Sequence, residues 1–375
     1  MLPCPRKTPV TGTDGRTGEA GVAEAILEID LDAIRANWRA LDARSAATVE
    51  TGAVVKADAY GLGMEKVAPA LAAAGARRFF VALAEEGASL RRVLGPGPEI
   101  FVFSGHMEGD GPLLADADLV PLVNSPEQLR RHVATLPGHP FGLQLDSGMN
   151  RLGIEPEEIG LLRAALPGAP RLVMSHLACA DEPDHPMNGR QLAAFREMAR
   201  GFDAPLSLAA TGGILLGSEY HFDLVRPGIG LYGGRPFAEA RPVVRLDLPL
   251  VQTRALAPGE AVGYSASWQA DRPATIATLS GGYADGILRS LSNRGRVFAD
   301  GIPCPLAGRV SMDLLTVDVS HLKEVPGLFE LLGPHQSIDD LAADAGTIGY
   351  EILTALGRRY RRIWREKRPT KEGRA

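Results

Sequence analysis

The sequence predicts an α/β fold in which an eight-stranded βα barrel of the TIM type is followed by a mainly antiparallel β domain. Two observations lead to this prediction. Between about residues 51 and 234, short apolar, β-branched runs alternate with longer segments of helical period, which is typical of βα units around a parallel sheet. After Gly233-Gly234 the pattern changes to short strands separated by Gly- and Pro-containing turns, which indicates an antiparallel domain.

Eight runs in the first region have the length and composition of buried parallel strands, and eight is the number that closes a βα barrel. In chain order they are residues 54–56, 79–83, 100–103, 119–123, 142–145, 172–176, 206–209 and 223–229. An alternating segment at 25–30, followed by helical spacing at 31–41, either precedes the barrel or closes part of it. The second region has strand-like runs at 243–248, 275–279 and 314–319.

Crossover helices are predicted where a capping signal precedes an apolar stripe. Ser125 supplies an N-cap and Pro126 the first helical residue, and Glu155-Pro156-Glu157 begins another helix. The sequence from Arg358 onwards is rich in Arg and Lys, which favours a solvated, partly disordered end over a binding arm. The predicted divisions are an N-terminal tail at 1–24, the barrel at 25–236, the β domain at 237–367 and a basic tail at 368–375.

Composition limits the classes of function. The 375 residues carry a formal net charge of -5, which favours a small-molecule substrate and gives no attraction to nucleic acid or to a membrane surface. The sequence has no apolar run long enough for a spanning helix or a secretory signal. Cys4, Cys179 and Cys304 have neither the spacing of a disulfide framework nor that of a metal site. We therefore predict a cytoplasmic protein without a metal.

Polar residues follow the predicted strands at their carboxyl ends, where barrel enzymes gather their catalytic groups. They come from five different strands and are Lys56, Arg151, His176, Thr211 and Arg226. Because all five should meet at one end of the barrel, they predict the position of an active site.

Lys56 ends a predicted buried strand, where a lysine is costly to keep charged unless it is paired. Desolvation lowers the pKa of such a lysine until its amine becomes nucleophilic, which is the preparation needed for a Schiff base. By position alone, a snorkelling or salt-bridged lysine is an equal alternative. The motifs around Lys56 favour the nucleophile.

The segment Lys56-Ala57-Asp58-Ala59-Tyr60-Gly61 resembles the cofactor-lysine motif of the alanine racemases, which are pyridoxal-phosphate enzymes of fold type III. The resemblance continues in order through residues 146–153, His176, 225–233, 263–265, 282–286 and 308–313. These matches span nearly the whole chain, and their order and spacing are more specific than any one motif. The resemblance implies an isomerase that interconverts L-alanine and D-alanine with pyridoxal 5'-phosphate as its cofactor.

The resemblance also implies roles for individual residues. Lys56 holds the cofactor as a Schiff base and is the acid/base group on one face of the substrate. Tyr264, from the partner subunit of a head-to-tail homodimer with shared active sites, serves the other face. His176 and Arg226 support catalysis, and Arg226 meets the pyridine nitrogen, where its tightly held proton weakens the electron sink. Hydroxyls and backbone amides hold the phosphate, from Tyr60, Thr211, Gly228, Ile229 and Tyr350.

The substrate pocket follows from the same resemblance. Arg151 is implied to bind the substrate carboxylate bidentately, while Met312 closes the pocket and Tyr283 narrows it. A narrow aromatic pocket favours a substrate as small as alanine. The family suggests that the product supplies cell-wall precursors.

Several of these residues also have purely structural interpretations. His176 can satisfy a local hydrogen bond, Arg226 can pair with Asp223 or another carboxylate, Gly228 can be an ordinary turn residue, and Tyr350 can be a half-buried core aromatic.

Three positions depart from the family pattern. Gln144 stands where many members carry a carbamylated lysine that orients the substrate arginine, so Arg151 needs another partner: the Gln144 amide, a bound anion or a carboxylate. Ala210 and Leu62 replace an asparagine near the cofactor and a histidine of the lysine motif. These departures bear on the rate and on strict alanine specificity. The alternative functions are, in order, a racemase of broader specificity, a fold type III decarboxylase, and a cofactor-binding protein without turnover.

Overall fold

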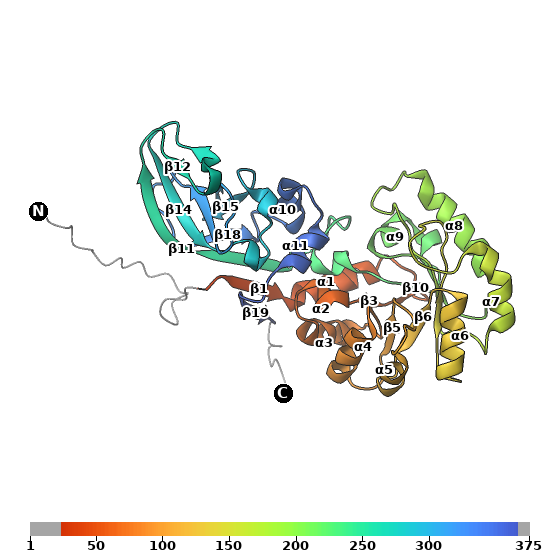
Figure 1. Cartoon of the computed structure of the whole chain (residues 1–375). Coiled ribbons are helices and arrows are strands. Elements are labelled where there is room, and N and C mark those ends of the chain that lie inside the picture. The colour runs from red at the N-terminus through yellow and green to blue at the C-terminus, as the bar shows by residue number, and fades with distance from the viewer. Residues whose placement is uncertain (1–23, 367–375) are drawn as a thin grey trace, which may run out of the picture.

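The structure is a computed structural model that describes residues 24–366. Figure 1 shows a sheet surrounded by helices and, beside it, a second unit built mainly of strands. Of the predicted N-terminal tail at 1–24, only the last residue is described, and the predicted basic tail at 368–375 lies outside the described residues. Within residues 24–366, no helix is both long enough and apolar enough to cross a membrane.

Seven short parallel strands form one curled sheet, and they follow one another in the sheet in chain order. Their bounds are β3 (Ala53–Val54), β4 (Arg78–Val81), β5 (Glu99–Val102), β6 (Val120–Val123), β7 (Gly142–Gln144), β8 (Val173–Met174) and β9 (Leu206–Ser207). Two further strands, β2 (Glu50–Thr51) and β10 (Leu224–Val225), pair in parallel with each other. The amide of Arg226, after β10, donates to the carbonyl of Ala209, after β9, at 2.9 Å.

The parallel strands are apolar along their whole length because both of their faces are buried. Phe80 and Phe101, from adjacent strands, are fully buried and stack with their ring centroids 5.0 Å apart. Each of the eight runs predicted as barrel strands overlaps one strand of the structure. A parallel βα arrangement followed by an antiparallel unit is therefore confirmed.

Helical elements connect the parallel strands, and the longer ones lie on the outside of the sheet (Figure 1), whereas the short element at residues 56–60 is a left-handed turn. They are α1 (Leu31–Asp42), α2 (Lys56–Tyr60), α3 (Met64–Ala74), α4 (Ala84–Leu94), α5 (Gly111–Asp116), α6 (Pro126–Thr135), α7 (Ile159–Ala165), α8 (Pro186–Ala199) and α9 (Thr211–Leu216), with 3-10 turns η1 (Pro156–Glu158), η2 (Ser218–Tyr220) and η3 (Ile229–Tyr232). The predicted cap of α6 is confirmed, because the Ser125 hydroxyl accepts from the amide of Gln128 at 3.2 Å. The second predicted start is the 3-10 turn η1, which leads into α7.

The second unit is an eight-stranded, mainly antiparallel sheet with the strand order β16-β15-β18-β11-β1-β19 and with β14 joining β11 to β17. Its strands are β1 (Ile26–Asp30), β11 (Val244–Leu256), β14 (Ala274–Ser280), β15 (Arg296–Ala299), β16 (Ile302–Pro305), β17 (Leu314–Asp318), β18 (Leu328–Leu332) and β19 (Arg361–Arg365). The other elements are the hairpin β12 (Ala261–Val262) and β13 (Trp268–Gln269), α10 (Ile338–Ala345), α11 (Gly349–Ala355), η4 (Tyr264–Ala266), η5 (Tyr283–Asp285) and η6 (Arg289–Leu291). The three strands predicted for this region are β11, β14 and β17.

Two strands of the second sheet come from the two ends of the described chain. β1 pairs antiparallel with β11 and parallel with β19, so the alternating segment at 25–30 is a strand of this sheet. The prediction of a solvated end from Arg358 onwards is wrong for β19. Its Arg362 and Trp364 side chains donate to the carbonyls of Gly61 and Leu62, at 2.5 and 2.9 Å. The basic strand is stable here because its long side chains reach acceptors in the first unit.

Candidate active site

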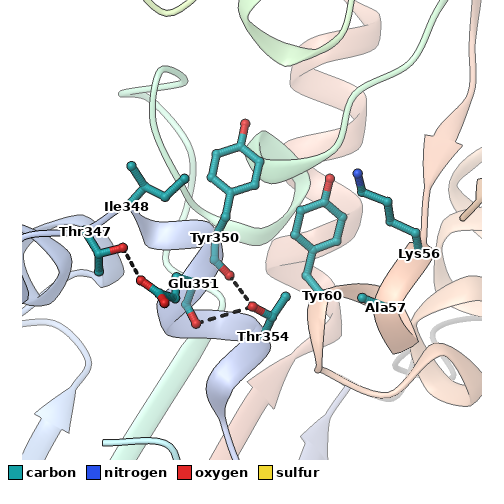
Figure 2. A pocket seen from close by; sticks show the side chains of 8 residues that line it. All are labelled: Lys56, Ala57, Tyr60, Thr347, Ile348, Tyr350, Glu351 and Thr354. Carbon is teal, nitrogen blue, oxygen red and sulfur yellow. Dashed lines mark hydrogen bonds between the residues drawn. The ribbon is translucent and has the colours of Figure 1, made fainter. Parts of the chain in front are cut away.

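A cavity of about 520 Å³ opens at the carboxyl ends of the parallel strands. Its wall brings together nine of the predicted site residues, namely Lys56, Tyr60, Arg151, His176, Thr211, Arg226, Gly228, Ile229 and Tyr350. Ile348 and Tyr350 come from the start of α11, so the second unit contributes one side of the wall. A smaller hollow shares Lys56 and Tyr350 with this cavity, and in Figure 2 the Lys56 amine and the Tyr60 and Tyr350 hydroxyls point to the same side.

The sequence predicted Lys56 as the last residue of a strand. In the structure Lys56 instead begins a left-handed turn, and the strand β3 ends at Val54. The four residues that follow it, Ala57 to Tyr60, have φ values between 52° and 56°. None of them is glycine, and a left-handed conformation costs an L-residue about 1–2 kcal/mol. Such strain persists where the surrounding structure holds it, which is common at functional sites. The turn directs Lys56 out of the sheet and into the cavity.

The Lys56 amine lies in a desolvated environment, with Nζ 5.8 Å from the centroid of the Phe103 ring. Burial lowers its pKa below the ordinary value of 10.5, the positive charge of Arg151 lowers this pKa further, and the Glu86 carboxylate opposes both effects. A lysine whose neutral form is favoured can act as a nucleophile and as a proton acceptor.

Arg226 is the largest side chain that is fully enclosed, with 1% of its surface exposed. Its guanidinium donates to the carbonyl of Ser175 at 2.7 Å and to the hydroxyl of Ser207. The Ser207 hydroxyl in turn donates to the carbonyl of Leu224 at 2.5 Å. Burial lowers the pKa of Arg226 to about 9, so the side chain keeps its charge at neutral pH.

The structural interpretation of Arg226 as half of a salt bridge is wrong. No carboxylate among residues 24–366 forms an ion pair with it, and Asp223 instead accepts a hydrogen bond from the amide of Leu206 at 2.8 Å. The charge is therefore held by neutral acceptors and remains directed into the cavity.

Thr211 joins the two loops that follow β9 and β10. Its hydroxyl accepts from the amides of Gly228 and Gly230, at 3.0 and 3.2 Å. A Cβ atom at residue 228 would collide with the Tyr60 hydroxyl, so only glycine leaves space at this point of the wall. The Thr211 and Tyr60 hydroxyls thus meet here and are donors of the kind that an anion requires, while the amides of Gly228 and Gly230 are bonded to Thr211.

Tyr60 and Tyr350 face each other across the cavity wall, with their ring centroids 6.0 Å apart. Burial raises the pKa of each phenol above its ordinary value of 10, so both hydroxyls remain protonated donors. Tyr350 is fixed on α11, where the Thr354 hydroxyl donates to its carbonyl at 2.9 Å, as Figure 2 shows.

His176 lies half-buried in the cavity wall, two residues after the end of β8. Burial, together with the positive charges of Arg226, Arg151 and Lys56, lowers its pKa to about 3. The imidazole is therefore neutral at neutral pH and can exchange hydrogen bonds without supplying a positive charge.

The loop that carries Arg151 is held by its own backbone. One oxygen of Asp146 accepts from the amides of Gly148 and Met149, each at 2.8 Å. One alternative predicted from the sequence paired the Gln144 amide with Arg151. In the structure this amide instead donates to the carbonyl of Leu152 at 3.1 Å. Within the described part of the chain, the Arg151 guanidinium has no hydrogen bond or ion pair, and it is exposed at the mouth of the cavity.

Three predicted site residues lie outside the cavity of this chain. Tyr264, Met312 and Tyr283 lie on the second unit and are 67%, 53% and 44% exposed. Tyr283 and Met312 lie near each other, because the Tyr283 amide donates to the carbonyl of Ser311 at 3.0 Å. A single chain does not bring these three residues to Lys56.

Sequence reasoning missed several residues that support the site. Ser175 and Ser207 hold Arg226, and their signal was a polar residue inside an otherwise apolar strand. Ile348 completes the wall from the second unit and carries no signal in the sequence. Glu86, which contacts the lysine turn, sits in an ordinary charged helix surface and could not be singled out.

Comparisons with known proteins agree along the whole described chain. Family models for the alanine racemase N-terminal domain and the alanine racemase C-terminal domain match residues 29–236 and 243–364. An alanine racemase of Cereibacter sphaeroides is 67% identical over 342 residues, which covers 91% of this chain and 98% of that protein.

Solved structures give the same result. The alanine racemase of Bartonella henselae, described with covalently bound pyridoxal phosphate, matches with a TM-score of 0.88 and 39% identity, over 92% of this chain and all of that chain. The biosynthetic alanine racemase of Pseudomonas aeruginosa matches with a TM-score of 0.86 and 37% identity, over the same shares. This chain belongs to the alanine racemase family.

Proposed function

We propose that this protein interconverts L-alanine and D-alanine with pyridoxal 5'-phosphate held at Lys56. One observation carries the proposal: a desolvated lysine, a cluster of anion-binding donors and a buried arginine line the same cavity at the ends of the parallel strands. The names of the relatives, and the pyridoxal phosphate described for the Bartonella henselae structure, support this substrate and cofactor.

The donors in the cavity fit this cofactor. The hydroxyls of Tyr60, Tyr350 and Thr211 can donate the hydrogen bonds that a phosphate accepts, and the backbone at Gly228 and Ile229 lies beside them. The Gly228 amide, which here donates to the Thr211 hydroxyl, would exchange that bond for one to the phosphate. The absence of a side chain at Gly228 lets the Tyr60 hydroxyl lie against this loop, because a Cβ atom there would collide with it. Arg226, which is charged at neutral pH, would donate to the ring nitrogen and would hold its own proton.

The residues of this chain would then handle the protons of the substrate. When bound, pyridoxal phosphate stabilises negative charge on the substrate α-carbon. Lys56, whose lowered pKa favours the neutral amine, takes or returns the proton on one face. The exposed Arg151 binds the carboxylate as a fork, and neutral His176 offers a hydrogen bond to the groups around it.

The second face requires a group that one chain does not provide. We assign it to the partner's Tyr264 in a head-to-tail homodimer with shared active sites. The exposure of Tyr264, Tyr283 and Met312 on the second unit supports an arrangement in which this surface covers the cavity of the other subunit. Tyr283 and Met312 would then narrow the pocket to the size of alanine.

The finer description of the fold is part of the same proposal. We infer that the eight parallel strands close into a TIM-type barrel within 25–236, followed by a β domain at 237–367, although the first strand of the 25–236 segment, β1, pairs with the second sheet. The pairing of β10 with β2, and the hydrogen bond from Arg226 to Ala209, support closure. We place the enzyme in the cytoplasm, where the free thiols of Cys179 and Cys304 would stay reduced and where D-alanine would enter cell-wall precursors.

The test is a racemisation assay on single enantiomers of the common amino acids. Alanine should be the fastest substrate. Lys56→Ala should abolish the visible absorbance of the lysine-bound cofactor and lower the rate by several orders of magnitude, while Lys66→Ala, at an exposed position of α3, should leave both unchanged. Faster turnover of another amino acid would replace alanine as the substrate. Release of carbon dioxide, or no turnover at all, would contradict the proposal.

A further inference from the structure

Glu86, in the first turn of α4, contacts the turn that carries Lys56. One oxygen of its carboxylate accepts from the amide of Ala57 at 2.7 Å. The other oxygen accepts from the amides of Ala82 and Leu83, at 2.7 and 3.4 Å. A single carboxylate therefore joins the residue after Lys56 to the loop between β4 and α4.

The hydrogen bond from Ala57 satisfies a backbone amide that has no acceptor within the turn itself. Ala57 is the first left-handed residue, with φ at 52°, and the first amide of a turn has no acceptor inside the turn. Among residues 24–366, Glu86 is the acceptor that this amide has. Because the acceptor is charged, the bond is stronger than one between neutral groups.

The far end of the turn is held by other residues. The Asp58 carboxylate accepts from the amide of Met64 at 2.7 Å, and Arg362 donates to the carbonyl of Gly61. At the start of the turn the amide of Ala59 donates to the carbonyl of Val55 at 2.9 Å, and Glu86 supplies the acceptor for the amide of Ala57, the residue next to Lys56. The negative charge of Glu86 also acts on the amine itself, since it raises the pKa of Lys56 against the effect of burial.

We propose that Glu86 is a positioning residue for Lys56, whose carboxylate fixes the start of the left-handed turn so that the amine points into the cavity. Glu86 lines neither cavity that contains Lys56 and acts through the backbone of Ala57. The inference rests on the proposed role of Lys56 as the cofactor lysine.

Two substitutions distinguish the positioning of Lys56 from two other effects of Glu86, which are the capping of α4 and the negative charge near the amine. Glu86→Gln can still cap α4, because a glutamine oxygen at this helix position accepts from the same amides, but its NH2 group then faces the N–H of Ala57. Glu86→Asp keeps the charge, but the side chain is one methylene shorter and does not span both contacts. Glu85→Gln is the matched control, since Glu85 is an exposed neighbour with the same charge.

The measurement is the binding of pyridoxal phosphate to cofactor-free protein, followed by the visible absorbance of the lysine-bound form and accompanied by thermal unfolding. Both Glu86 variants should form the bond to Lys56 about tenfold more slowly or weakly, which is the size expected for the loss of one charged hydrogen bond. Glu86→Gln should unfold near the wild-type temperature, and Glu85→Gln should match the wild type throughout.

Normal cofactor binding by Glu86→Gln and Glu86→Asp would overturn the inference. A defect in Glu86→Gln alone would also overturn it, because charge and not the bridge would then matter. A wild-type protein that forms no lysine-bound cofactor would contradict the proposed function itself, and that outcome is visible before any variant is compared.

Discussion

The cavity at the ends of the parallel strands and the exposed surface of the second unit differ in how their polar groups are held. In the cavity, Arg226 is enclosed and Thr211 is tied to two backbone amides. On the second unit, Tyr264 and Met312 have more than half of their surface exposed. The polar side chains of the cavity are held in place by contacts within a single chain, whereas the side chains of Tyr264 and Met312 are largely uncovered.

This difference indicates which half of the chemistry a single chain can prepare. A preorganised cavity can bind a cofactor without rearrangement, because its donors already have fixed positions. Exposed side chains have nothing to orient them until a second surface covers them. A racemase needs acid/base groups on both faces of its substrate, so the comparison supports the proposal that a partner subunit completes the active site.

The strongest test of this comparison mixes two inactive proteins. Lys56→Ala and Tyr264→Phe should each be inactive or nearly so as pure dimers. If the surface of the second unit completes the cavity of the partner, one of the two sites in each mixed dimer contains both intact residues. Random mixing after dissociation should then restore about a quarter of the wild-type activity.

Mixing Lys56→Ala with a second variant of the same cavity, such as Arg226→Ala, is the control, because both cavities of each mixed dimer are then defective. This mixture should regain no activity beyond that of the two pure variants, so recovery seen only with Tyr264→Phe places Tyr264 in the other subunit's site. If Lys56→Ala and Tyr264→Phe do not complement each other, the two residues act in the same subunit and the comparison fails.

A smaller effect tests how tightly the cavity is organised. Gly228→Ala places a methyl group against the Tyr60 hydroxyl, and overpacking of this kind should weaken the binding of pyridoxal phosphate by about tenfold. Gly160→Ala, in α7, has open space around its Cβ and should bind the cofactor normally. Equal affinities, measured by titration of the visible absorbance, would mean that the wall can yield at Gly228.

The smallest expected effect concerns pH. The pKa of His176 is about 3 in the folded protein and near 6.5 in the unfolded chain, so the unfolded chain takes up this proton first as the pH falls. The stability contributed by neutral His176 is thus present above pH 6.5 and is lost as the pH falls towards 3.

His176→Asn should therefore flatten the loss of stability between pH 7 and pH 5 by at most about 1 kcal/mol per pH unit. Urea unfolding of both proteins at several pH values measures this difference. Parallel curves for the two proteins would show that His176 is protonated in the folded state as readily as in the unfolded chain.

Much of the fold and of the cavity could be predicted because it depends on local patterns. Buried parallel strands need continuous apolar runs, and residues that follow such strands must meet at one edge of the sheet. This logic placed Lys56, His176 and Arg226 in one cavity. It also identified the cap at Ser125, because capping depends on residues three positions apart.

The remainder depended on contacts that no local pattern contains. The left-handed turn from Ala57 to Tyr60 has no glycine to announce it, and it is held by Glu86 and by residues about 300 positions away. The strand pairing of β1 with β19 is equally remote, and the basic composition of β19 is typical of a tail. Long-range pairing of this kind overrides the local preference.

The position of β19 also determines when the site can be completed during synthesis. Arg362 lies 301 residues after Gly61, whose carbonyl it binds, and Trp364 lies 302 residues after Leu62. The chain leaves the ribosome from its N-terminus, so the turn that carries Lys56 emerges early and waits for nearly the whole chain to be translated. A nascent protein can assemble its parallel strands before Arg362 and Trp364 can fasten this turn, because β19 follows all of the parallel strands in the chain.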